Sequence, residues 1–341
     1  MGLGRINIMH NKKGVLFTII AIVIAAFLSL IFSSRIETAP DYRMDLVETR
    51  INMLYDYVNS FYDFAGEAST LAGYGAIYGI ATNISMSHEY DPLFNQHFNS
   101  CFLTGNLTSS QACPGMTTKH LPYYLDQFTA QAKKNLKISS NYSIDISSIY
   151  VDQVTDPFAV DIFFNISLNV SDAFVNMTTL RNIHVIVPID NIPDPLFSAN
   201  NYSRLINRSS LNKAESSWNS TDLESLYNNH QYRAYSNALS FINRIKGNFT
   251  TSRMGIESIV NQSNVTIGLI DIDVDIDISM IDYLFWNRTG FDCSGKELVR
   301  INSTLLSTIG LTDPKGLQID DVHRLSFNIA SSNAYILSWC P

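Results

Sequence analysis

A run of 19 residues without a charged side chain, Gly14 to Phe32, constrains this chain more than any other feature of its sequence. As an α-helix the run would be about 28 Å long, which matches the hydrocarbon core of a lipid bilayer. Arg5, Lys12 and Lys13 precede the run and no acidic residue does, so the positive-inside rule places the N-terminus in the cytoplasm. The prediction is a cell-membrane protein with a basic cytoplasmic tail (1–13), a transmembrane helix (14–33) and an extracellular remainder.

A cleaved secretory signal peptide is the alternative interpretation of this run. The apolar core of such a signal is usually about 7–15 residues long and ends before a small-x-small cleavage site. The present run is longer, and the segment Ile31-Phe32-Ser33-Ser34-Arg35 fits such a site poorly. The sequence therefore favours a retained anchor whose partner is the lipid bilayer.

The residues at the start of the run carry a further signal. Asn11-Lys12-Lys13-Gly14 is followed directly by Val15-Leu16-Phe17-Thr18, and this arrangement resembles the class III signal of archaeal type IV pilins and their relatives. The resemblance implies that a prepilin peptidase cuts between Gly14 and Val15. It also implies that the hydrophobic helix stays at the mature N-terminus and mediates self-assembly. A plain signal-anchor, with basic residues before an apolar run, remains the alternative.

The rest of the chain is dense in Asn-x-Ser/Thr sequons, none of which has Pro in the middle. Their number is nearly three times that expected by chance from the Asn, Ser and Thr content. Such a set favours N-glycosylation of a surface-exposed ectodomain, against the alternative of unused sites in an Asn/Ser-rich chain. All of them follow the membrane run: Asn83, Asn106, Asn141, Asn165, Asn169, Asn176, Asn201, Asn207, Asn219, Asn248, Asn261, Asn264, Asn287 and Asn302.

The four cysteines also lie on the extracellular side. They are Cys101, Cys113, Cys293 and Cys340. An even number of cysteines in an oxidising compartment predicts two disulfides, for which three connectivities exist. We favour Cys101–Cys113, which closes a short loop, and Cys293–Cys340, which would tie down the C-terminus.

Helical periodicity follows the membrane run. Apolar residues recur at alternating intervals of three and four through more than five turns, which predicts a long amphipathic helix over about 41–80. We expect irregular structure over 83–118 and a short helix over 121–136. These segments form a predicted helical stem and disulfide loop region, 41–140.

The remainder, 141–341, is predicted to be a β-rich glycosylated extracellular head with inserted helices. Residues 160–170 alternate between apolar and polar side chains, as in a half-buried strand, and 181–189 is the expected partner strand. The fold class is therefore α+β. Other expected elements are a helix starting at Ser220, a helix over 232–246, and strands over 264–279, 281–286, 324–329 and 335–339.

The most unusual segment of the head alternates carboxylates with β-branched residues. Strand geometry would place Asp271, Asp273, Asp275 and Asp277 on one face, with neighbours roughly 6.5–7 Å apart. A calcium ion would relieve the repulsion within such a ladder, because Ca²⁺ prefers carboxylate oxygens. The alternative is a solvated acidic face that protects a sheet edge. No other cofactor is predicted.

Enzyme and nucleic-acid signatures are weak. Gly73 to Gly79 nearly matches a dinucleotide fingerprint but ends a predicted helix, so we interpret it as close helix packing or helix termination. The chain has more acidic residues (31) than basic ones (23), which argues against nucleic-acid binding. We expect a non-enzymatic, pilin-like or envelope structural protein; a ligand-binding ectodomain (adhesin or sensor) and a membrane-anchored hydrolase are the alternatives.

Overall fold

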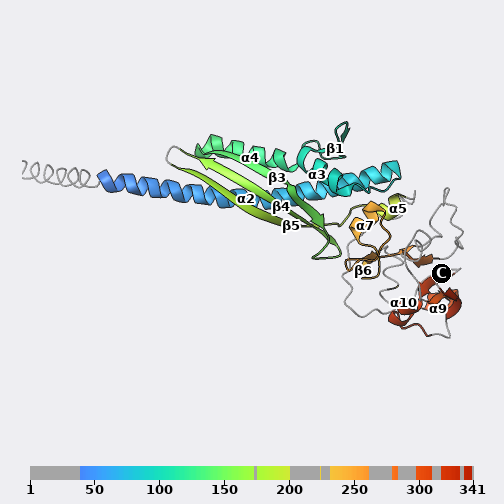
Figure 1. Ribbon diagram of the computed structural model, residues 1–341. Helices are drawn as coiled ribbons and strands as arrows, with labels where there is room; N and C mark the ends of the chain where they lie inside the picture. Colours follow the sequence, from blue (N-terminus) through green and yellow to red (C-terminus); the bar gives the residue numbers. More distant parts are fainter. Residues whose placement is uncertain are drawn as a thin grey trace, which may run out of the picture.

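A single long helix organises the computed structural model, which describes residues 39–172, 175–199, 223, 231–260, 279–282, 297–308, 316–330 and 334–339. This helix, α2, runs from Ala39 to Ser87 over 49 residues. Its N-terminal end projects as a stalk, and its remainder lies along a three-stranded sheet (Figure 1). Mixed helices and sheet make the fold α+β, and the predicted long helix is confirmed.

The predicted membrane run at Gly14–Phe32 lies outside the described residues. Within the part of the chain that is described, no helix contains a stretch long and apolar enough to cross a membrane.

The sheet is antiparallel, in the order β3-β4-β5. β4 (Ala159–Ser171) is central, between β3 (Ser139–Asp152) and β5 (Asn176–Pro188). Every second residue of β4 is buried under the helices, as the predicted alternation requires: Val160, Ile162, Phe164, Ile166, Leu168 and Val170 are at most 1% exposed. The predicted strand and its partner are therefore confirmed, although β5 begins earlier than expected.

Strand β3 was not anticipated from the sequence. The pairing of β3 with β4 is interrupted, because Asp145 pairs with Asn165 whereas Tyr150 pairs with Phe163. The four residues between Asp145 and Tyr150 thus lie opposite only Phe164. Such a bulge breaks the two-residue period on which strand recognition from sequence depends.

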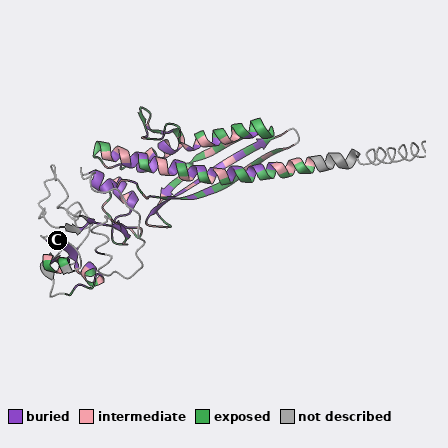
Figure 2. Ribbon diagram, turned by 180° about the vertical axis from the view of Figure 1, so that it is seen from behind, coloured by how far each residue is buried: buried purple, intermediate pink, exposed green. Residues whose placement is uncertain are grey.

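Two helices lie side by side on the inner face of the sheet. α2 packs on β4 and β5, while α4 (Leu121–Leu136) packs on β3. The inward side of each helix is buried and the outward side exposed (Figure 2). α4 has the predicted bounds, with the ring of His120 accepting a hydrogen bond from the Tyr123 backbone N–H at its start.

The glycine-rich part of α2 brings the helix close to its neighbours. A Cβ on Gly73 would overlap the Ile162 side chain, and a Cβ on Gly79 would lie 2.7 Å from Cys113 Sγ and 2.9 Å from the Pro114 carbonyl oxygen. Close packing is therefore confirmed for the Gly73–Gly79 segment. Termination there is wrong, since α2 continues to Ser87.

The segment predicted to be irregular contains a helix, α3 (Phe94–Thr104). Phe94, Phe98 and Phe102 recur at intervals of four and are fully buried. The packing of these rings on the core stabilises the helix. A two-stranded hairpin, β1 (Asn106–Thr108) and β2 (Gln111–Ala112), follows it. The predicted disulfide Cys101–Cys113 links the helix to the residue after the hairpin.

The C-terminal half is built from shorter elements. A sheet in the order β12-β10-β11-β9-β8 combines antiparallel pairs with a parallel pair, β9 and β11. Its strands are β8 (Ile259–Val260), β9 (Ser279–Ile281), β10 (Glu297–Ile301), β11 (Leu317–Asp320) and β12 (Ala334–Trp339). The remaining elements are α5 (Pro195–Ser198), β6 (Arg233–Ala234), α7 (Phe241–Lys246), β7 (Ile256–Glu257), α9 (Ser303–Thr308) and α10 (Asp321–Ser326).

Two predictions in this half are wrong. The expected helix over 232–246 is helical only from Phe241, because Ser240 caps it and the preceding residues pair as β6. The expected strand over 324–329 begins inside helix α10, whose N-terminus is capped by the Asp320 carboxylate. The strand predicted at 335–339 is confirmed as β12. Three other predictions lie mostly outside the described residues. They are the strands at 264–279 and 281–286 and the helix that starts at Ser220.

Candidate functional site

Several predicted site residues lie outside the described residues. The acidic ladder (Asp271, Asp273, Asp275 and Asp277), the processing pair (Gly14 and Val15) and the second cysteine pair (Cys293 and Cys340) all belong there. Among the residues that are described, no three His, Cys, Asp or Glu side chains are grouped to hold a metal ion. The calcium prediction therefore stays a prediction.

The sequons within the described residues share one property: none of their asparagines is buried. They are Asn83, Asn106, Asn141, Asn165, Asn169, Asn176, Asn248 and Asn302. The other six predicted sites, Asn201, Asn207, Asn219, Asn261, Asn264 and Asn287, lie outside the described part.

Four of these sequons gather on the outer face of the β3-β4-β5 sheet, the face turned away from the helices. Strand register places Asn141 opposite Asn169 and Asn176 opposite Ser171, with Asn165 farther along β4. The hydroxyl residue of each sequon lies two positions on and therefore on the same face. All four acceptors and their Ser or Thr partners thus share one surface.

The same face carries a row of rings at its end farther from the stalk. Tyr150, Phe163 and His184 are cross-strand neighbours on β3, β4 and β5. The rings of Phe163 and His184 stack with centroids 4.2 Å apart, and the Tyr150 ring lies 6.2 Å from that of Phe163. We call these three residues the aromatic row.

A buried carboxylate holds the aromatic row in place. Asp161 Oδ1 lies 2.8 Å from His184 Nε2, while its Oδ2 accepts hydrogen bonds from the backbone N–H groups of Val154 and Thr155. Burial raises the pKa of Asp161, but these hydrogen bonds outweigh it and the pKa is lowered overall. Asp161 is therefore an anion that orients His184.

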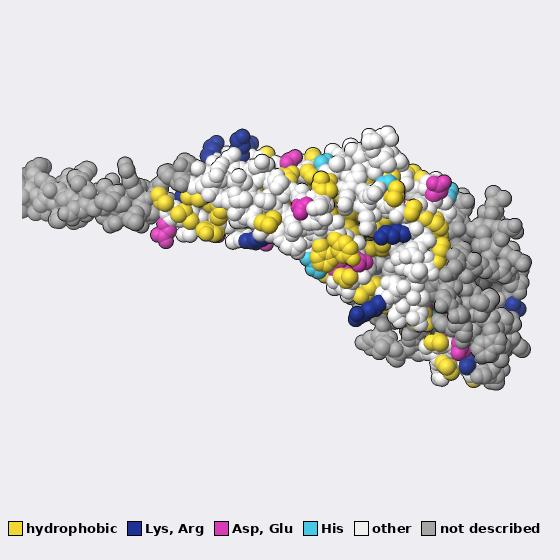
Figure 3. All heavy atoms as spheres, viewed as in Figure 1, with side chains coloured by type: hydrophobic (Ala, Val, Ile, Leu, Met, Phe, Trp, Pro, Cys, Tyr) yellow, Lys and Arg dark blue, Asp and Glu magenta, His cyan; other side chains and the backbone are white. Residues whose placement is uncertain are grey.

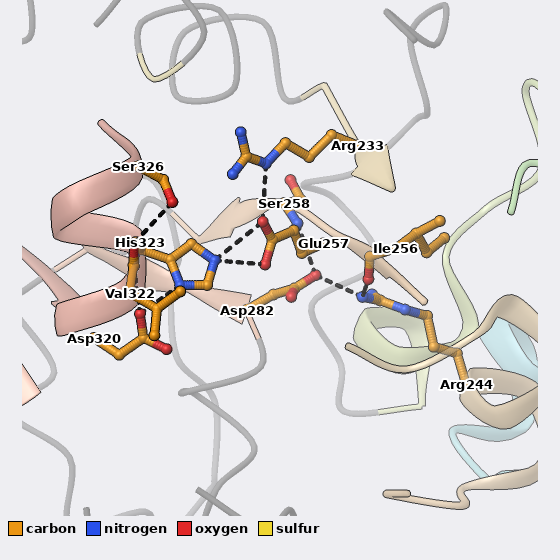
Figure 4. A network of polar contacts seen from close by, with 10 residues as sticks. All are labelled: Arg233, Arg244, Ile256, Glu257, Ser258, Asp282, Asp320, Val322, His323 and Ser326. Carbon is orange, nitrogen blue, oxygen red and sulfur yellow. Dashed lines mark hydrogen bonds and ion pairs between the residues drawn. The ribbon is translucent and has the colours of Figure 1, made fainter. Parts of the chain in front are cut away.

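A second cluster of polar side chains is fully buried in the C-terminal half (Figure 4). Arg244 on α7 lies at one end of it, and Nη1 and Nη2 each lie 2.7 Å from a carboxylate oxygen, of Asp194 and Asp282 respectively. Asp194 also accepts hydrogen bonds from the Tyr232 hydroxyl and the Leu196 backbone N–H. One guanidinium thus joins α7 to the start of α5 and to the end of β9.

His323 lies at the other end of this cluster. Its Nδ1 is 2.6 Å from Asp320 Oδ1 and its Nε2 is 2.9 Å from Glu257 Oε2. Burial lowers the pKa of His323, but the charge of Glu257 and the hydrogen bonds to both carboxylates raise it to about 9. Arg233 Nε binds the other oxygen of Glu257 at 2.9 Å. The imidazolium thereby connects β7 to α10.

The buried network has a structural role in the described fold. His323, Asp320 and Glu257 have side chains at most 1% exposed, so no substrate reaches them without the fold opening. Buried charges are tolerated only when they are paired, and removing one partner is strongly destabilising. The network therefore holds together short elements that are far apart in the sequence.

A groove lies between the two helices that cover the sheet. It has a volume of about 350 Å³. Met53 and Tyr57 of α2 form one wall, and Phe128, Ala132 and Leu136 of α4 form the other. Figure 3 shows two adjacent basic side chains over the end of α4 nearest the stalk, where Lys133 and Lys134 occupy the last turn.

Comparisons with protein-family models, with curated proteins and with solved structures found no match for this chain.

Sequence reasoning missed both the buried network and the aromatic row. Arg244 lies in the segment Phe-Ile-Asn-Arg-Ile-Lys, where it falls among apolar residues on the buried side. A charged residue on the apolar side of a predicted helix indicates a buried ion pair, and this pattern could have been recognised in the sequence. Tyr150 and His184 gave no comparable signal, because they meet Phe163 only through strand pairing.

Proposed function

We propose that this protein is a glycosylated, non-enzymatic cell-surface protein with a pilin-like or envelope structural role. The observation that carries the proposal is the placement of α2, which begins seven residues after Phe32 and extends into the core of the head. A predicted membrane helix followed so closely by a stalk helix would give one nearly continuous rod. Such a rod suits a subunit that is anchored and assembled through its N-terminal segment.

The distribution of sequons indicates which side of the head would contact neighbouring subunits in such an assembly. The outer face of the β3-β4-β5 sheet carries four sequons, whereas α4 carries none and α2 carries only Asn83, near its C-terminal end. Sugars on the sheet face would keep neighbouring subunits away from it. Contacts between subunits would then use the side of the head formed by α2 and α4.

The processing prediction is tested at the N-terminus of the native protein. In membrane extracts, N-terminal sequencing and intact mass should give a chain that starts at Val15 and carries additional sugar mass. Gly14→Leu should leave the first 14 residues in place, because the residue before the cut is changed, and should prevent recovery of the protein in surface assemblies.

Gly4→Leu is the matched control, because it makes the same change within the basic tail and should be processed normally. A wild-type chain that starts at Met1 or Gly2 would show a plain signal-anchor and refute processing after Gly14.

The groove between α2 and α4 favours a second candidate, a ligand-binding ectodomain. Its volume of about 350 Å³ lies within the range of small-molecule sites, and its lining is largely apolar, as in such sites. A head that stays monomeric after processing and binds a ligand saturably, with binding lost in Tyr57→Ala, would favour this candidate over assembly.

A further inference from the structure

We infer that the oligosaccharide on Asn165 packs against the aromatic row of the same molecule, so that this row is an internal sugar-binding surface. The inference rests on the proposed glycosylation of the head. It adds a specific contact and a specific role for one of the sequons.

The aromatic row forms a partly exposed surface on the outer face of the sheet, the face turned away from α2 and α4. Tyr150 is 53% exposed, and Ile186, the next outward residue of β5 after His184, is 45% exposed. Apolar side chains that cluster on a surface usually mark a binding site. The occupant must tolerate water on its other side, as a sugar does.

Asn165 is the sequon placed to reach this surface. It is the next outward residue after Phe163 on β4, roughly 6.5–7 Å away along the strand. The Oδ1 of Asn165 accepts a hydrogen bond from Asn182 Nδ2 at 3.0 Å. This bond fixes the carboxamide by its oxygen and leaves Nδ2, the atom to which the sugar is linked, directed away from Asn182.

Crowding by the neighbouring sequons favours extension along β4 toward Phe163. Asn141, Asn169 and Asn176 occupy the half of the outer face nearer the stalk, where Arg50 of α2 binds Asp172 just after β4. Sugars on these residues would fill the space on that side of Asn165. The sugar on Asn165 therefore extends toward Phe163. There, pyranose C–H groups cover the exposed part of the aromatic row and exclude water from it.

The test measures access to Tyr150 in the full glycosylated chain, by the rate of tyrosine nitration at that residue followed by peptide mass spectrometry. Ser167→Ala removes the sequon of Asn165 and should raise the nitration rate of Tyr150 severalfold. Ser167→Thr keeps the sequon and should leave the rate unchanged. Ser143→Ala is the matched control, since it removes the Asn141 sugar from the same face at the end away from the aromatic row.

Two outcomes would overturn the inference. One is a Tyr150 rate that is equal in wild type and Ser167→Ala although the Asn165 peptide carries sugar. The other is an Asn165 peptide without sugar while other sequons are occupied. Both would leave the proposed surface glycoprotein intact. That proposal fails separately if the peptides of all sequons, including Asn141 and Asn248, lack sugar.

Discussion

At the scale of single residues, His323 makes the stability of the head depend on pH. The pKa of His323 is about 9 in the folded chain, between Asp320 and Glu257, and about 6.5 in an unfolded one. A pKa raised by folding stabilises the fold fully below the unfolded value, and this contribution is lost as the pH rises through the folded value. The sequence did not reveal this pairing, because residues 257 and 323 are brought together only by the fold.

We expect the wild-type protein to lose stability between about pH 6.5 and pH 9, by an amount on the order of 3 kcal/mol from this residue alone. Thermal unfolding followed by circular dichroism across this range measures the loss. His323→Gln should be less stable near pH 6 and should show a flatter profile over the same range. An unchanged slope in the variant would assign the pH dependence to other groups.

The predicted acidic ladder is tested by the same measurement with calcium. If Asp273 and Asp275 bind the ion, calcium should raise the melting temperature of the wild-type head, because a ligand that binds only the folded state stabilises it. Asp273→Asn combined with Asp275→Asn should abolish the increase. If calcium does not change the melting temperature of the wild type, the ladder does not bind the ion and is a solvated acidic face.

At the scale of elements, the sequence predicted what depends on local periodicity and missed what depends on packing or pairing. α2, α4 and β4 have clear periods of 3.6 or 2 and were predicted. β3 was missed because of its bulge opposite Phe164. The second half of α10 was predicted as the beginning of a strand over 324–329, and the helix start at the Asp320 cap was missed.

Two glycines of α2 allow the packing of this helix to be tested. Gly79→Ala should destabilise the protein by about 1–3 kcal/mol, since its Cβ would meet Cys113 and the Pro114 backbone. Gly66→Ala should stabilise it by about 0.5–1 kcal/mol, because its Cβ would have no atom within 4 Å and alanine favours the helix. Urea unfolding measures both changes. Equal effects at the two positions would contradict the close contact at Gly79.

At the scale of the whole molecule, the predicted helical stem (41–140) and the first strands of the predicted head (141–341) pack on one another. The sheet of the head does not follow the stem as a separate body but packs along α2, so both share one core. The Tyr62 hydroxyl donates to the Thr179 carbonyl near the start of β5, and the Tyr74 hydroxyl donates to the Asp190 carbonyl just after its end. Local sequence patterns carry no information on such long-range docking, which is why the predicted boundary at residue 140 falls within a single packed unit.

This shared core has a mechanical consequence. A pulling force applied at Ala39 would enter the head through α2 itself, along a direction in which the strands of the β3-β4-β5 sheet also extend (Figure 1). The load would therefore act in shear over the whole length of the helix-sheet contact, and the Arg50–Asp172 ion pair would be among the first contacts to bear it. Contacts loaded in parallel must break together, whereas those of a domain pulled from one edge separate one at a time. A head joined to its stalk helix in this way can transmit tension without unravelling from the point at which the force is applied.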